Sequence, residues 1–194
     1  MRPLLFAILL SCGCSTATLR AYRQTAAFEE EYSTDIPGGV LPGGTRVLYP
    51  AWLAEADRPQ VLAGVESYLA PLRAAYPGAP WPDLVVLIHP ACPFMAPWKA
   101  RVLGCRHGPL VVVSWARKAD GTPRTRNPWP TLPHEALHWI AATTGQDSRD
   151  GSAWMMDPGR LALDRQAQAV AAPCPVGEAS RTAARAYVYR PWTE

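Results

Sequence analysis

The sequence predicts an α+β domain in which a small twisted β-sheet packs against helices. Apolar residues recur at helical spacing between positions 58 and 76, and a second amphipathic pattern spans 133–144. Between them lie two continuous runs of apolar residues, rich in valine, which indicate buried strands. With 194 residues, 48% of them hydrophobic and 18% charged, the chain is large enough for one compact domain and too apolar for wholesale disorder.

The first expected elements are a short strand and a long helix. Residues 46–49 have the composition of a strand. From position 58 the apolar residues follow the i, i+3, i+4, i+7 pattern of an amphipathic helix, and Pro77-Gly78 ends it. The apolar positions of this helix are Val61, Leu62, Val65, Tyr68, Leu69 and Leu72.

Two buried strands and a second helix come next. The apolar runs at 84–88 and 110–113 are bounded by proline and glycine, and their length suits strands. The second helix begins near Thr131, which we expect to be its N-cap, and Gly145 suits the position just past its end. The remaining expected elements are a helix at 161–172 and an edge strand at 187–189.

The first residues have the pattern of an export signal. Met1-Arg2-Pro3 is a short positive region, and seven apolar residues follow at positions 4–10. This run is too short for a membrane-spanning helix, which needs about 20 residues, but it suits the apolar core of a signal peptide. Residues 9–12, Leu-Leu-Ser-Cys, overlap the end of this run and resemble a bacterial lipobox, which implies that Cys12 is lipidated. An alternative frame places the lipid on Cys14.

This resemblance implies a protein of the bacterial cell envelope. We expect residues 1–12 to be a lipoprotein signal peptide with its lipobox, 13–44 a tether or irregular lead-in, and 45–194 the folded domain. The expected location is a membrane to which the N-terminal lipid anchors the chain, with the domain facing the periplasm or the exterior.

The cysteine count agrees with an oxidising compartment. If Cys12 carries the lipid, four other cysteines remain, which is an even number. If Cys14 carries it, Cys12 is removed with the signal peptide and three remain, which is an odd number. Cys92 and Cys105 enclose a short proline-rich loop, so we expect a disulfide between them. Ordinary buried thiols are the alternative.

The second helix carries the sequence His-Glu-Ala-Leu-His. Its two histidines, His134 and His138, are four residues apart and therefore share a helical face, close enough to bind one metal ion. Glu135 projects to the side of that face. This HExxH arrangement resembles that of the zincin metallopeptidases. The resemblance implies a zincin-like fold, a Zn²⁺ ion held by both imidazoles, and Glu135 as the general base towards a zinc-activated water.

The third ligand does not follow the best-known zincin branches. The positions that metzincins fill with glycine and histidine are Ala141 and Thr144, and no glutamate lies between Glu135 and Glu178. An aspartate is therefore the expected third ligand, as in aspzincin-like proteins. The candidates are Asp147, Asp150 and Asp157, whereas Asp164, on the last expected helix, is assigned to solvent. His89 and His107 are further candidates for a site role.

The predicted function is an exported, lipid-anchored zinc metallopeptidase that hydrolyses a peptide or protein substrate. Its 19 basic and 16 acidic residues give a net charge of only +3, and the basic residues are scattered, which argues against nucleic-acid binding. The alternative is a non-catalytic envelope lipoprotein that uses a degenerate zincin-like scaffold for binding.

Overall fold

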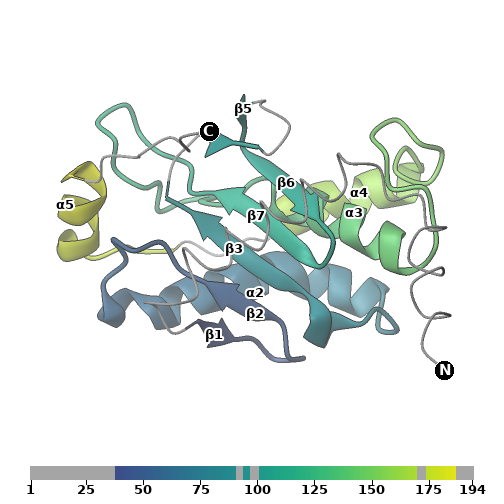
Figure 1. The fold of residues 1–194 in the computed structure, drawn as a ribbon, viewed down its shortest axis with the longest axis horizontal. Helices are drawn as coiled ribbons and strands as arrows, with labels where there is room; N and C mark the ends of the chain where they lie inside the picture. Colours follow the sequence, from purple (N-terminus) through teal and green to yellow (C-terminus); the bar gives the residue numbers. More distant parts are fainter. Residues whose placement is uncertain (1–37, 91–93, 97–100, 170–173, 187–194) are drawn as a thin grey trace, which may run out of the picture.

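The computed structural model of the chain describes residues 38–90, 94–96, 101–169 and 174–186, which form an α+β structure with a five-stranded mixed sheet (Figure 1). The order across this open sheet is β1-β2-β3-β7-β6. A separate two-stranded ribbon joins β4 to β5. The strands are β1 (Gly39–Val40), β2 (Arg46–Leu48), β3 (Val85–His89), β4 (Phe94–Met95), β5 (Arg101–Val102), β6 (Gly104–His107) and β7 (Leu110–Ser114).

The centre of the sheet is parallel and both of its edges are antiparallel. Strand β3 pairs in parallel with β2 and β7, with Val86 opposite Val111. The edge strands β1 and β6 run antiparallel to β2 and β7. Strands β3 and β7 are buried at every position, as the continuous apolar runs that make up most of each strand predict. The predicted strands at 46–49, 84–88 and 110–113 are thus confirmed.

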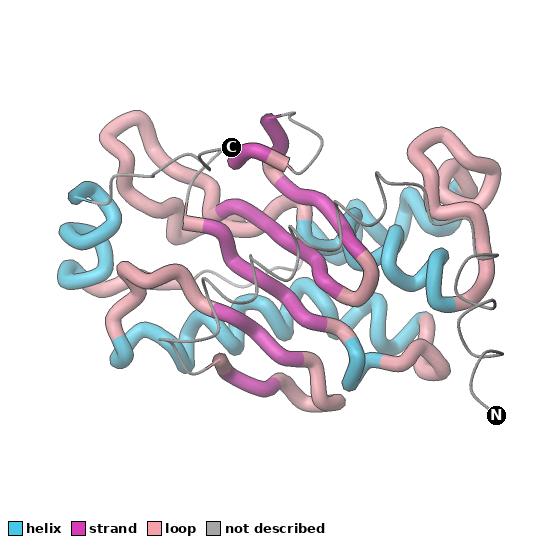
Figure 2. Tube along the Cα trace, viewed as in Figure 1, coloured by secondary structure: helices cyan, strands magenta, loops and turns pink. Residues whose placement is uncertain are grey.

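Four α-helices accompany the sheet in the described part of the chain, and α2 runs behind the strands in the view of Figure 2. Helix α3 contacts β6, β7 and α2, and α4 packs on both α2 and α3. The helices are α2 (Arg58–Ala75), α3 (Leu132–Thr143), α4 (Pro158–Ala169) and α5 (Glu178–Ala186), and two 3₁₀ turns, η1 (Glu55–Asp57) and η2 (Trp81–Asp83), precede α2 and β3. No helix among the described residues is long and apolar enough to cross a membrane.

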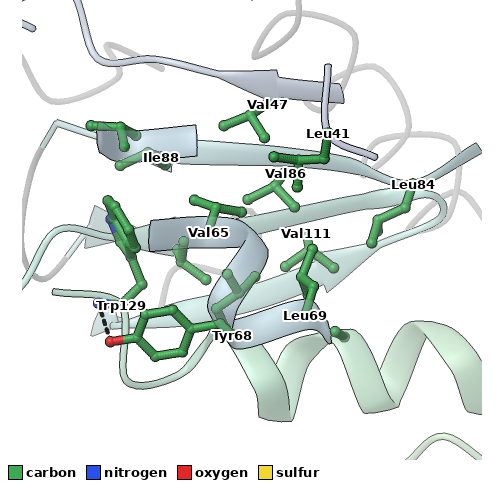
Figure 3. Packing of buried hydrophobic residues seen from close by; sticks show 14 of the residues in the cluster. Leu41, Val47, Val65, Tyr68, Leu69, Leu84, Val86, Ile88, Val111 and Trp129 are labelled. Carbon is green, nitrogen blue, oxygen red and sulfur yellow. Dashed lines mark hydrogen bonds between the residues drawn. The ribbon is translucent and has the colours of Figure 1, made fainter. Parts of the chain in front are cut away.

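The main core lies between the sheet and α2 (Figure 3). Because strand residues alternate between faces, the even-numbered positions of β3 point into this core and the odd-numbered ones into a second cluster on the other face. The Tyr68 hydroxyl accepts a hydrogen bond from the backbone N–H of Trp129 (3.4 Å) and donates one to Asn127. The buried side chains of the main core include Val47, Val65, Leu69, Val86, Ile88 and Val111.

Some elements differ from the expectation. Strand β1 lies within the segment 13–44, so the sheet takes in the end of the expected lead-in. Helix α4 begins at Pro158 instead of 161, and α5 has no counterpart among the predicted elements. Its only apolar residues are alanines, and only Ser180 and Ala184 of it are buried. The lipidation candidates Cys12 and Cys14, the disulfide candidate Cys92 and the edge strand expected at 187–189 lie outside the described residues.

Candidate metal centre

The two histidines and the glutamate lie outside the face that helix α3 packs into the main core. It begins after Thr131, whose hydroxyl donates to the Leu103 carbonyl instead of capping the helix. Gly145, with φ +73°, turns the chain at its end, as its predicted position requires. The packed face of α3 consists of Leu132, Ala136, Leu137, Trp139 and Ile140.

The two imidazoles converge through their Nε2 atoms. These atoms of His134 and His138 are 3.0 Å apart, and the rings are almost perpendicular at 89°. The Nδ1 atom of His138 lies 2.5 Å from the Ser148 carbonyl oxygen, to which an Nδ1–H donates. That hydrogen bond leaves the Nε2 lone pair free for a metal ion. Burial lowers the pKa of His138 by more than the hydrogen bond to the Ser148 carbonyl raises it. The neutral, metal-binding form of the imidazole is therefore favoured.

Asp150 completes a three-residue group with the histidines. Its Oδ1 atom is 3.0 Å from Nε2 of His138 and 3.4 Å from Nε2 of His134. The three possible ligand atoms all lie within 4.8 Å of one another. Ligand atoms placed about 2.0–2.1 Å from a tetrahedral zinc ion are separated by about 3.3 Å. The donor set of two nitrogens and one oxygen, together with these separations, is therefore compatible with a divalent metal ion such as zinc.

The other two candidate aspartates have different partners. Asp147 forms a two-pronged ion pair with Arg149, which lowers the pKa of this carboxyl to about 2. Asp157 accepts hydrogen bonds from the backbone N–H groups of Gly159 and Arg160 at the start of α4. Among the three candidates, only Asp150 belongs to the metal-binding group that the described residues form.

Asp164, which we assigned to solvent, is instead buried beside the site. It is 8% exposed, and its Oδ2 atom lies 3.6 Å from Nδ1 of His134, an ion-pair distance too long for a hydrogen bond. Asp164 has the largest influence on the pKa of His134 and raises it, while desolvation lowers it. The spacing of Leu161, Asp164 and Ala167 places all three on one helical face, and that signal could have revealed the position.

Glu135 packs against the edge strand of the sheet. A Cβ atom added to Gly104 would lie 2.9 Å from its Cγ and 3.1 Å from its Oε1, so the absence of a side chain on Gly104 permits this close approach. Burial raises the pKa of Glu135 to about 7, and the neighbouring His134 lowers it. Asp150 raises this pKa further and Arg106 lowers it. A carboxyl with a pKa near neutrality is suited to both accepting and returning a proton.

The remaining candidates lie apart from this group. Cys105 is a buried free thiol whose pKa burial raises to about 12. Its pairing with Cys92 stays a prediction, because that residue is outside the described part. His89 is buried at the end of β3 with its ring stacked on Phe94, and His107 ends β6. Neither histidine belongs to the metal-binding group found among the described residues.

Comparisons with known protein families, with curated proteins and with solved structures found no match for the chain. The fold and the grouping of side chains around α3 are therefore the observations on which a functional assignment depends.

Proposed function

We propose that the chain is a zinc-dependent metallopeptidase of the zincin type, anchored by an N-terminal lipid in the bacterial cell envelope. One observation carries the proposal: His134, His138 and Asp150 direct two nitrogens and one oxygen to a common point, next to the half-buried Glu135. Three protein ligands and one open position are the arrangement of catalytic zinc sites, whereas structural sites use four protein ligands.

A bound zinc ion would supply Lewis-acid chemistry and lower the pKa of a water molecule towards neutrality. The residues of the chain supply the rest. The Ser148 carbonyl orients the His138 imidazole by accepting its Nδ1–H, and the Asp164 carboxylate, 3.6 Å from Nδ1 of His134, acts on that ring through its charge. Glu135 takes a proton from the attacking water and passes it to the leaving amine. Its packing against Gly104 restricts where its carboxylate can lie.

The residue types around the site support a peptide or protein as the proposed substrate. Hydrolysis of a peptide bond needs a nucleophile, a polarising cation and a group that transfers a proton. In the proposed centre the zinc-bound water, the zinc ion and Glu135 would fill these three roles. The export signal and lipobox support a substrate outside the cytoplasm, such as an envelope protein or peptide.

The first test measures the metal content of the purified protein by inductively coupled plasma mass spectrometry. We expect about one zinc per chain in the wild type and a small fraction of that in His138→Ala. Circular dichroism on both proteins separates loss of the metal from loss of the fold. Substoichiometric zinc in a folded wild type, after incubation with zinc and dialysis, would refute the proposal.

The second test addresses catalysis. Glu135→Gln should keep its zinc and lose peptidase activity by about 10²–10⁴-fold, the usual contribution of a general base. Glu178→Gln, which makes the same change on the exposed part of α5, serves as the control and should keep full activity. A zinc-loaded wild type that cleaves no peptide in a broad fluorogenic library would favour the non-catalytic binding protein instead.

A further inference from the structure

The edge strand β6 presents a guanidinium to the candidate metal centre. Strand residues alternate between faces, and Cys105 belongs to the core cluster on the far side of the sheet. Gly104 and Arg106 therefore share the opposite face, towards α3 and Glu135. The Arg106 Nη2 atom lies 3.3 Å from the Ser148 hydroxyl, in the loop whose carbonyl contacts His138. The side chain of Arg106 therefore extends from the edge strand to the loop that carries Asp150.

The hydrogen bonds of Arg106 leave most of its donors available. A guanidinium has five N–H donors. The described residues give it two acceptors, the Ser148 hydroxyl and the Gly108 carbonyl at 3.4 Å, and both are neutral and distant. In the described ranges no carboxylate lies within ion-pair distance of it. The side chain is half-buried, and its charge influences the pKa of Glu135 and of His138.

We infer that Arg106 binds a carboxylate group of the peptide substrate beside the scissile bond, and so determines substrate specificity. This inference rests on the proposed peptidase function. Three acidic side chains, Glu135, Asp150 and Asp164, lie around the histidines, and a bound zinc ion would offset most of their charge, so Arg106 is a side-chain cation beside the metal position that remains available to a substrate carboxylate. Arg106 offers the planar pair of donors that matches a carboxylate in bidentate geometry. The carboxylate comes either from the free C-terminus of the peptide or from an acidic side chain.

Equilibrium binding to the zinc-loaded Glu135→Gln variant tests the inference without interference from cleavage. The probes are fluorescein-labelled alanine-rich peptides in three forms: a free C-terminus, a C-terminal amide, and an amide with one internal aspartate. Adding Arg106→Gln should weaken binding of the preferred carboxylate peptide by about 10- to 100-fold. It should change binding of the neutral amide peptide by less than about twofold. The form that loses affinity identifies the source of the carboxylate.

The control is Arg101→Gln, which removes the same charge from an exposed position on β5. It should leave all three affinities within about twofold, because exposed charges at a distance are screened by salt. Arg106→Lys keeps the charge but loses the bidentate geometry, and we expect intermediate binding. Thermal unfolding of each variant checks that the fold is kept.

Three outcomes would overturn the inference: equal binding of carboxylate and amide peptides, equal weakening of all three by Arg106→Gln, or no binding of any carboxylate peptide. Failure of the peptidase function is separate from these. A wild type that binds carboxylate peptides through Arg106 but cleaves none contradicts the proposed function and leaves the carboxylate site in place. A wild type that cleaves peptides, with equal losses for all three substrates in Arg106→Gln, supports the function and rejects the specificity role.

Discussion

The position of Asp164 beside His134 leads to a quantitative prediction about zinc affinity. Asp164→Asn removes a charge 3.6 Å from Nδ1 of His134 and keeps the size of the side chain. Two full charges at that distance interact by about 4–5 kcal/mol at an effective dielectric constant near 20. This is an upper limit, because an imidazole that binds metal is neutral and feels the carboxylate only through its polarised Nδ1–H.

Replacing such a supporting carboxylate typically weakens metal binding by 10- to 100-fold. We therefore expect the zinc dissociation constant of Asp164→Asn to rise by that factor, equivalent to about 1.4–2.7 kcal/mol. Competition with a chromophoric chelator at fixed pH and ionic strength measures this change. Asp150→Asn, which alters a proposed ligand, should weaken binding more than Asp164→Asn does.

The matched control is Asp147→Asn. This carboxylate lies in the same loop as Asp150 but pairs with Arg149, and the asparagine keeps the Oδ1 atom that accepts the Arg149 backbone N–H. Its zinc affinity should stay within about twofold of the wild type. Equal effects of Asp147→Asn and Asp164→Asn would show that general charge, and not orientation of His134, controls the affinity. No effect of Asp164→Asn would contradict its supporting role.

Three further predictions follow from the packing. Gly104→Ala should cost about 1–3 kcal/mol in the free energy of unfolding and lower kcat, because its Cβ would clash with both the Thr131 hydroxyl and the Glu135 side chain. Gly78→Ala, which meets no atom within 4 Å, is the control, and denaturant titration measures both. Free zinc at about 100 times its dissociation constant should stabilise the protein by about 2.7 kcal/mol, and calorimetry with and without a chelator should show a higher Tm with zinc. Burial raises the pKa of Cys174 to about 12, so this thiol should stay protonated and react with iodoacetamide near neutral pH only after unfolding. Rapid labelling of Cys174 in the folded protein, located by peptide mapping, would contradict this.

The central elements of the fold were predictable because their sequences have one consistent pattern. The runs that became β3 and β7 are apolar at every position, and this suits strands covered on both faces. Strand β6 was missed because its sequence, Gly-Cys-Arg-His, has no apolar alternation, and its pairing with β7 supplies what the local sequence lacks. Helix α5 was missed because its apolar residues are all alanines, which give a weak hydrophobic signal in the sequence.

The metal-binding group was predictable in part. Spacing within one helix places His134 and His138 together whatever the rest of the chain does. Which aspartate joins the histidines depends on the path of the loop after α3. Hydrogen bonds within that loop set its path, and helical periodicity in the sequence does not reveal them. Asp164 was assigned to solvent because it lies on a helix whose apolar residues Leu161 and Leu163 were expected to face the core, whereas the packing of α4 on α3 places Asp164 beside His134.

The loop after α3 shows why Asp147 and Asp150 are not interchangeable. Asp147 shapes the loop: its Oδ1 accepts the Arg149 backbone N–H, and its carbonyl accepts the Ser152 hydroxyl. The turn so formed directs the Ser148 carbonyl and the Asp150 carboxylate to the same imidazole, that of His138. Zinc bound between α3 and Asp150 would therefore also hold this exposed loop in place. Removal of the metal should increase amide hydrogen exchange most between residues 146 and 151, and uniform exchange with and without zinc would contradict this coupling.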